Sequence, residues 1–154
     1  MSVTVEQVLA AKSDGGRTVY TVHRDSTVLE ALALMADRGI GALVVMDGEE
    51  IAGIVTERDY ARKVELRQRL AGETRVEEIM TERVRYVEPT QSADECMALM
   101  TEHRMRHLPV LRDGRLSGIV SIGDLLKQQI ADQQFTIDQL EHYIHGVPSV
   151  VRPM

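Results

Sequence analysis

The feature that most constrains what this chain can fold into is an internal repeat. Residues 19–62 align with residues 84–127 without a gap, and about a dozen of the aligned positions are identical. Each residue of the first copy stands 65 positions before its counterpart, so that Asp59 matches Asp124. The fold must therefore be built from two similar supersecondary units.

Each copy is predicted to run in the order strand, helix, strand, strand, helix. In the first copy Val19–Val22 is rich in β-forming residues. Thr27 and Glu30 then form the capping-box pattern that begins a helix, and Gly39 is placed to end that helix with a positive φ. The helix should bury a face of apolar residues spaced three and four apart.

The next two strands of each copy are expected on either side of an Asp-Gly turn. Their predicted positions are residues 42–46 and 51–56 in the first copy, and residues 108–111 and 116–121 in the second. A further helix should begin near Glu57 in one copy and near Ile122 in the other. Together these elements predict an α/β (α+β) fold.

The two copies are linked too closely for fully independent domains. We expect residues 1–75 to hold an N-terminal helix and the first copy, and residues 76–145 to hold the second copy and a long C-terminal helix. Residues 146–154 contain two Pro and are expected to form a loose tail.

The composition is ordinary for a globular protein, with 44% hydrophobic and 27% charged residues. Since the chain has no Trp and one Phe, its core must be built from aliphatic side chains and Met. The net charge of −6 argues against a protein that binds the phosphate backbone of nucleic acid, because such proteins carry a basic face.

The single Cys96 cannot form a disulfide within the chain, which fits a reducing compartment. The first residues lack the basic leader and apolar run of a signal peptide, and no stretch approaches the ~20 apolar residues that cross a bilayer. We therefore expect a cytoplasmic protein that is not inserted in a membrane.

Four short motifs at matching places resemble those of the tandem CBS-domain family, the cystathionine-β-synthase-type regulatory pair. They are GIVTERD at residues 53–59, GIVSIGD at 118–124, MRHLPV at 105–110 and VEEIMT at 76–81. The resemblance implies two units related by pseudo-twofold symmetry, adenosine-type ligands in the clefts between them, and a homodimer. It also implies a regulatory protein without catalytic activity, and the protein that it regulates is unknown.

By this resemblance, the carboxylates of Asp59 and Asp124 would accept hydrogen bonds from ribose hydroxyls, and Thr56 and Ser121 would add hydroxyl contacts. The position suits such a ligand, because a helix that begins here offers unpaired N–H groups and a partial positive charge. The alternative is that Thr56 and Ser121 are only N-caps, and that the two Asp are first-turn acids favoured by the helix dipole.

The phosphate end of a nucleotide needs cations, and here the two copies differ. The family's basic pair falls on Arg106 and His107, and Arg58 stands at the start of the helix in the first copy, so one anionic group could be held by all three. The counterpart of Arg58 is Gly123, which predicts two clefts of unequal affinity. The alternative is that both arginines are solvated surface charges.

By the family pattern, adenine would lie against the first strand and the residues before the second strand. One cleft would use Thr18, Tyr20, Ile40 and Gly41, and the other would use Arg83, Arg85, Met105 and Arg106. Tyr20 has the alternative role of a rim residue that shields the core.

Two further features are expected to have no catalytic or metal-binding role. Cys96 takes the place of Ala31 on a buried helix face, where it should be a small core residue rather than a nucleophile. His142 and His145 are spaced to chelate a metal, but a solvated helix face is the simpler interpretation.

These observations favour a non-catalytic module that senses an adenine nucleotide of the AMP, ATP or NAD type. Such a ligand would act as a regulator and not as a required cofactor, and the signal would be a change of conformation or of oligomeric state. The alternative function is a structural dimerisation module whose clefts are vestigial and empty.

Overall fold

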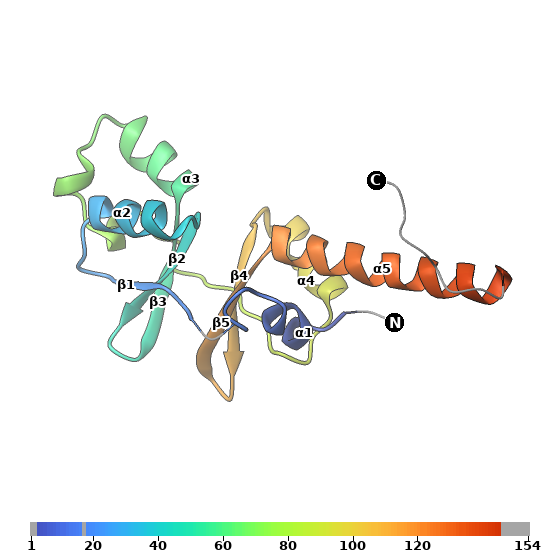
Figure 1. Cartoon of the computed structure of the whole chain (residues 1–154). Coiled ribbons are helices and arrows are strands. Elements are labelled where there is room, and N and C mark those ends of the chain that lie inside the picture. The colour runs from blue at the N-terminus through green and yellow to red at the C-terminus, as the bar shows by residue number, and fades with distance from the viewer. Residues whose placement is uncertain (1–2, 17, 146–154) are drawn as a thin grey trace. The chain divides into compact units, whose positions relative to one another are not determined.

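The computed structural model describes residues 3–16 and 18–145 and divides them into two compact units (Figure 1). Unit 2 comprises residues 18–86 together with residues 111–118. Unit 1 comprises residues 3–16, 87–110 and 119–145. Both contain helices and strands, so the predicted α/β class is confirmed.

Unit 2 contains the first copy of the repeat. Its elements in chain order are β1 (Thr21–His23), α2 (Val28–Arg38), β2 (Ala42–Asp47), β3 (Glu50–Thr56), α3 (Glu57–Tyr60), a π-helical turn (Ala61–Glu65) and two 3₁₀ turns, η2 (Ala71–Glu73) and η3 (Val76–Glu78). The three strands form one sheet in the order β1-β2-β3, with β1 parallel and β3 antiparallel to β2. The first strand therefore lies slightly later than predicted.

Helix α2 begins and ends as the sequence predicts. Oγ1 of Thr27 accepts a hydrogen bond of 3.1 Å from the backbone N–H of Glu30. Gly39 ends the helix with a φ of 64°, which a residue without a Cβ adopts readily. The buried face consists of Val28, Ala31 and Met35, spaced three and four apart.

Unit 1 contains most of the second copy. Its elements in chain order are α1 (Val5–Ala10), α4 (Ala93–His103), β4 (His107–Arg112), β5 (Arg115–Ser121) and α5 (Ile122–His145), with the β4–β5 turn assigned to unit 2. Strands β4 and β5 pair with one another. The C-terminal helix was expected and is 24 residues long.

The first strand predicted for the second copy is reduced to a single bridge, in which Val87 pairs in parallel with Val110. Its counterpart Val22 pairs with Val45 within a ladder of three residue pairs. Pro109 takes the place of Val44 in the neighbouring strand. Proline has no N–H to donate, so the parallel ladder of the second copy loses one of its hydrogen bonds at this position.

The segments that precede the two copies are exchanged between them. The segment that precedes the first copy packs on the second: Val5 donates a backbone hydrogen bond of 2.8 Å to Gln91. The segment that precedes the second copy packs on the first: Val76 donates one of 2.8 Å to Ser26, the counterpart of Gln91. Each segment thus completes the core of the copy other than the one that it directly precedes.

This exchange makes the grouping of the chain differ from the linear division expected at residue 75. Helix α1 belongs to the unit of the second copy, because its buried side chains Val5, Val8 and Leu9 join that copy's core. The segment with Val76 and Ile79 joins the core of the first copy. The expected tail, residues 146–154, lies outside the described residues.

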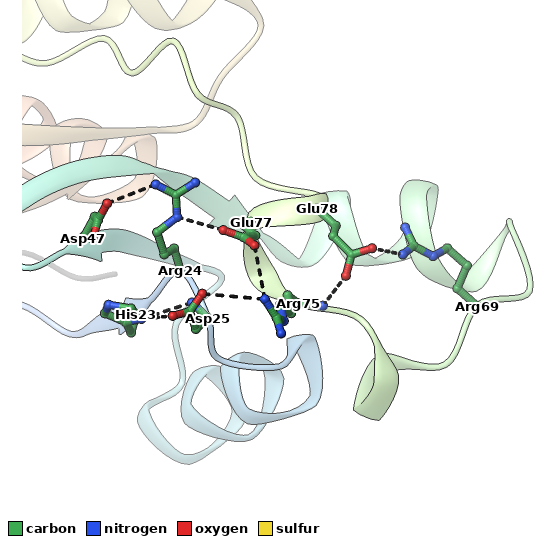
Figure 2. Close-up of polar contacts among 8 residues, drawn as sticks. All are labelled: His23, Arg24, Asp25, Asp47, Arg69, Arg75, Glu77 and Glu78. Atoms are coloured by element: carbon green, nitrogen blue, oxygen red, sulfur yellow. Dashed lines mark hydrogen bonds and ion pairs between the residues drawn. The ribbon is translucent and has the colours of Figure 1, made fainter.

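A chain of ion pairs holds the η3 segment on the first copy (Figure 2). Arg24, just after β1, donates to Glu77 at 2.8 Å and to Asp47 at 3.1 Å, and these bonds raise the pKa of the Arg24 guanidinium. Glu78 accepts from the backbone N–H of Arg75 and from the side chain of Arg69, which lowers the pKa of its carboxyl. These ion pairs and hydrogen bonds therefore hold η3 against the ends of β1 and β2.

Candidate functional site

In the first copy, the candidate site is the corner where β3 ends and α3 begins. The backbone N–H of Asp59 donates to Oγ1 of Thr56 at 3.1 Å. Oδ2 of Asp59 accepts from the backbone N–H of Thr56 at 3.0 Å and from its hydroxyl at 3.1 Å. Thr56 and Asp59 thus form a complete capping box, and the carboxylate is held in one orientation with 15% of the side chain exposed.

The other carboxylate oxygen of Asp59 faces a cation that the sequence analysis did not single out. Nζ of Lys63 lies 3.4 Å from Oδ1 of Asp59 and donates a hydrogen bond of 2.8 Å to the carbonyl oxygen of Ile79. Lys63 lies in the π-helical turn that follows α3. Its spacing of four residues from Asp59 was a readable signal, because such residues are neighbours on a helix surface.

The second copy builds the same corner where β5 meets α5. Oδ2 of Asp124 accepts from the backbone N–H of Ser121 at 2.9 Å, and Oγ of Ser121 accepts from the backbone N–H of Asp124 at 3.0 Å. The Asp124 side chain is 30% exposed, twice as much as that of Asp59. Among the residues that the structure describes, Oδ1 of Asp124 has no hydrogen-bond or ion-pair partner.

A lysine also stands beside this second carboxylate, but it comes from a different part of the chain. Nζ of Lys12 lies 3.5 Å from Oδ2 of Asp124 and donates a hydrogen bond of 2.9 Å to the carbonyl oxygen of Ile119. Lys12 lies in the loop after α1, so the exchanged N-terminal segment brings it to the corner. Nothing in the local sequence around Asp124 indicates this neighbour.

The two corners share a backbone hydrogen bond that joins the helix start to the residue just before β2 in the first copy and just before β4 in the second. The N–H of Glu57 donates to Gly41 at 3.1 Å, and the N–H of Ile122 donates to Arg106 at 2.9 Å. At Gly41 an added Cβ would lie 3.0 Å from Oε1 of Glu57. The predicted residues Gly41 and Arg106 are therefore placed at the corners of their own copies.

The three predicted phosphate-binding residues are divided between the units. Arg58 lies in unit 2 and is exposed, while Arg106 and His107 lie in unit 1, Arg106 exposed and His107 partly buried. Within the described residues the Arg58 guanidinium forms no hydrogen bond or ion pair. That all three residues bind one anion together remains a prediction.

The residues predicted to contact adenine differ in how far they are buried. Tyr20, Ile40 and Met105 are partly buried and pack against the cores of their units. The guanidinium of Arg38 lies over the Tyr20 ring, 5.0 Å from its centre, which fits both a ligand contact and the alternative role of a rim residue. Thr18 is exposed.

Cys96 has the surroundings expected of a small core residue. Cys96 is a fully buried member of the unit 1 core, and desolvation, assisted by the nearby Glu95 carboxylate, raises the pKa of its thiol to about 11. In residues 3–16 and 18–145 no group of three or more His, Cys, Asp or Glu is arranged to hold a metal ion. No helix in that part of the chain has the length and apolar character needed to span a bilayer.

The chain is similar to known proteins over most of its length. The family model for the CBS domain matches residues 16–66 and 76–131. The CBS domain-containing protein CBSX3, mitochondrial, of Arabidopsis thaliana is 38% identical over 153 residues, which cover 94% of this chain and 73% of the relative. A solved structure of a protein with CBS domains from Burkholderia ambifaria MC40-6 is 69% identical, with a TM-score of 0.83 over 88% of this chain and 99% of that one.

A more distant solved structure is the CBS domain pair of protein MJ0100, in complex with 5′-methylthioadenosine and S-adenosyl-L-methionine. It is 24% identical, with a TM-score of 0.72, and the match covers 86% of this chain and 99% of that one. At this identity the likeness concerns the fold alone.

Proposed function

The chain belongs to the CBS-domain family, and we propose that it is a regulatory module that binds an adenine nucleotide at the two Asp corners. The observation that carries the proposal is the duplicated capping box with a lysine beside its carboxylate. Capping alone needs neither the repetition of Asp at both corners nor the recruitment of Lys12 from another segment. A nucleotide needs both an oriented acceptor and a cation.

The carboxylates keep capacity for a ligand after they have formed the caps. A carboxylate offers about four lone-pair sites. Asp59 uses Oδ2 for the cap and Oδ1 for Lys63, while Asp124 uses Oδ2 for both its cap and its lysine. Asp124 thus has one oxygen free of described partners, and we propose that it accepts from ribose hydroxyls, as Asp59 does with its remaining lone pairs.

We propose that the two corners differ in affinity for a phosphorylated ligand. The first copy carries Arg58 where the second has Gly123, and the second carries Arg106 and His107 where the first has Gly41 and Ala42. The cations are therefore distributed unevenly between the copies. Isothermal titration should resolve two binding events of unequal affinity, or one event with a second too weak to saturate.

The choice of adenosyl ligands for the first screen follows from the family and from one distant fold relative. AMP, ATP and NAD are the proposed class, and 5′-methylthioadenosine and S-adenosyl-L-methionine are included because the MJ0100 domain pair was solved with them. A ligand at one hundred times its Kd should stabilise the protein by about 2.7 kcal/mol. Thermal unfolding of the full chain with each compound is the measurement, with guanosine and cytidine nucleotides as controls.

The competing function is a structural dimerisation module with empty sites. The exposed apolar residues on α5, which include Phe135 and Ile144, favour an association role for that helix. A protein whose melting temperature no adenosyl compound raises, but which remains oligomeric, would support this alternative. A ligand-dependent rise that the Asp59 and Asp124 variants reduce would support nucleotide sensing.

Catalytic activity, location in the cell and oligomeric state are also matters of proposal. We propose that the protein has no catalytic activity, acts in the cytoplasm and forms a homodimer. A solved structure 29% identical, with a TM-score of 0.72 over 82% of this chain and 71% of that one, is the hexameric CBS-CP12 protein from bloom-forming cyanobacteria, so larger assemblies occur among similar folds. Sedimentation analysis of this chain distinguishes a dimer from a hexamer.

A further inference from the structure

Helix α5 extends past the rest of unit 1 (Figure 1). It exposes a series of large apolar side chains. Near its start, Leu125 is buried and Ile122 packs against the core. From Ile130 to Ile144 nearly every side chain is exposed. A helical stretch of this length is marginal in water without tertiary packing, so the extension needs a partner surface.

Five of the exposed large apolar residues of α5 share one face of the helix, whereas Phe135 and Tyr143 lie off that face. Six positions alternate in steps of four and three along one face, and we name them the α5 seam: Leu126, Ile130, Gln133, Ile137, Leu140 and Ile144. This is the a/d repeat of a coiled coil, with Ile130, Ile137 and Ile144 at a positions and the two Leu at d positions. Phe135 lies on the opposite face of the helix.

We propose that the α5 seam packs against the α5 seam of a second copy of this chain as a parallel, two-stranded coiled coil. β-Branched Ile at a positions with Leu at d positions is the combination that favours parallel dimers. The α5 seam would then be the surface through which the proposed homodimer forms. This pairing does not depend on nucleotide binding.

The polar residue in the seam is the reason for choosing a second copy as the partner. Gln133 occupies a d position between Ile130 and Ile137, where an apolar partner would leave its amide without a hydrogen bond. In a parallel pair in register, Gln133 of one chain meets the partner's Gln133, and the two amides bond to one another. Single polar layers in coiled-coil seams are known to specify register, at a positions in particular.

The residues that flank the seam agree with the same arrangement. In a parallel pair, Gln129 of one chain lies beside the partner's Gln134, and Thr136 lies beside the partner's Glu141. No two like charges face one another across these positions. The flanks therefore bring no electrostatic repulsion to the pairing of two identical chains.

The first test compares two substitutions on opposite faces of α5 in the full chain, measured without nucleotide. Ile137→Asp changes a seam residue that is 45% exposed, and Phe135→Asp changes an off-seam residue that is 64% exposed. Sedimentation velocity over a range of concentrations should show the wild type at twice the 17.2 kDa of one chain. Ile137→Asp should raise the dimer Kd at least a hundredfold, and Phe135→Asp should change it less than threefold.

Three outcomes of this test would overturn the proposal. They are a wild type that stays monomeric at high concentration, an Ile137→Asp variant that dimerises as well as wild type, and equal weakening by both variants. The second outcome would leave self-association through another surface intact. Thermal shifts with nucleotide on Ile137→Asp separate a failure of the seam from a failure of ligand binding.

A second test fixes the orientation of the two helices. Leu140→Cys places a thiol at a d position, which a parallel pair brings next to the partner's residue 140. Mild oxidation should link this variant into covalent dimers quickly, while Phe135→Cys should remain unlinked, and the native Cys96 is buried and contributes no background. Slow linking of Leu140→Cys, or equal linking of both variants, would contradict the parallel seam.

Discussion

Nζ of Lys12 lies 3.5 Å from Oδ2 of Asp124 and donates a hydrogen bond of 2.9 Å to the carbonyl oxygen of Ile119. One side chain thus connects the N-terminal segment to both the last strand and the candidate site of the second copy. Lys63 has the same pair of functions in the first copy, where it contacts Asp59 and the carbonyl oxygen of Ile79. Both corners thus have a lysine beside the Asp carboxylate, although the two lysines are not counterparts in the repeat and face different carboxylate oxygens.

Lys12→Met should lower the free energy of unfolding by about 1 kcal/mol, because a hydrogen bond to a carbonyl is lost and the ion pair is only partly screened by water. Urea unfolding measures this change, and part of it should disappear in 1 M salt. Lys63→Met should have a similar effect. No change in either variant would mean that these lysines do not hold the corners together.

Asp59→Asn and Asp124→Asn should each weaken nucleotide binding at their own corner by at least about tenfold, because bonds to a charged acceptor contribute roughly 1.5–3 kcal/mol. Each variant keeps a carbonyl oxygen for the cap, so it should lose less than about 1 kcal/mol of stability. Isothermal titration and urea unfolding measure the two effects. Loss of stability without loss of affinity would assign these residues to capping alone.

Glu30→Gln is the matched control for those variants. Glu30 occupies the same place in the cap of α2, where its Oε1 accepts from the hydroxyl of Thr27 at 3.2 Å. The substitution should change stability by a similar amount and leave nucleotide affinity unchanged.

Gly53→Ala should destabilise the protein by about 2–3 kcal/mol, since its Cβ would lie 2.6 Å from the carbonyl oxygen of Thr81 and 2.8 Å from Sδ of Met80. Gly123→Ala provides the contrast, because its Cβ would lie 3.6 Å from Oγ of Ser121, an ordinary contact. That variant should gain about 0.5–1 kcal/mol by lowering the entropy of the unfolded chain. Thermal unfolding of both variants in the same buffer should show a lower melting temperature for Gly53→Ala and a higher one for Gly123→Ala than for the wild type.

Arg104→Gly should stabilise the protein by about 0.5–1 kcal/mol. Arg104 ends α4 with a φ of 53°, as Gly39 ends α2 with a φ of 64°, and a side chain is strained in this left-handed region. Gly39→Arg should show the reverse effect of about 1 kcal/mol. A loss of stability in Arg104→Gly would show that the arginine side chain contributes more than its backbone strain costs.

Between about pH 9 and about pH 11 the wild type should lose stability relative to Cys96→Ala. Burial raises the pKa of the Cys96 thiol from 9.0 to about 11. In that range the unfolded thiol has released its proton while the folded one still holds it, so rising pH favours the unfolded state. Urea unfolding at several pH values measures the difference, and a constant difference would contradict the shifted pKa.

The repeat pattern and its turn signals predicted most of the elements, because capping residues, glycines at positive φ and apolar spacing act locally. The missing first strand of the second copy depends on Pro109 in a neighbouring strand, which a comparison of identical positions overlooks. The pairs Thr56–Asp59 and Ser121–Asp124 lie where a strand gives way to a helix, as their spacing indicated, while their role in binding stays a prediction. Lys63 was within reach of a spacing argument. Lys12 was not, because tertiary packing alone brings it to Asp124.

The N-terminal helix was predicted, but its packing on the second copy was not, although a related signal was present in the sequence. Val5, Glu6 and Val8 are spaced as Val76, Glu77 and Ile79 are, but at an offset longer than that of the repeat. The resemblance shows that both segments have the same role. It does not show which copy each segment covers, and only the three-dimensional packing decides that.

The exchange of leading segments makes the two halves of the gene product depend on one another for folding. A polypeptide cut between residues 65 and 76 would carry, in each half, a covering segment suited to the other half and a hydrophobic surface without its own cover. Neither fragment should fold when expressed alone, whereas the two expressed together should restore each other by complementation.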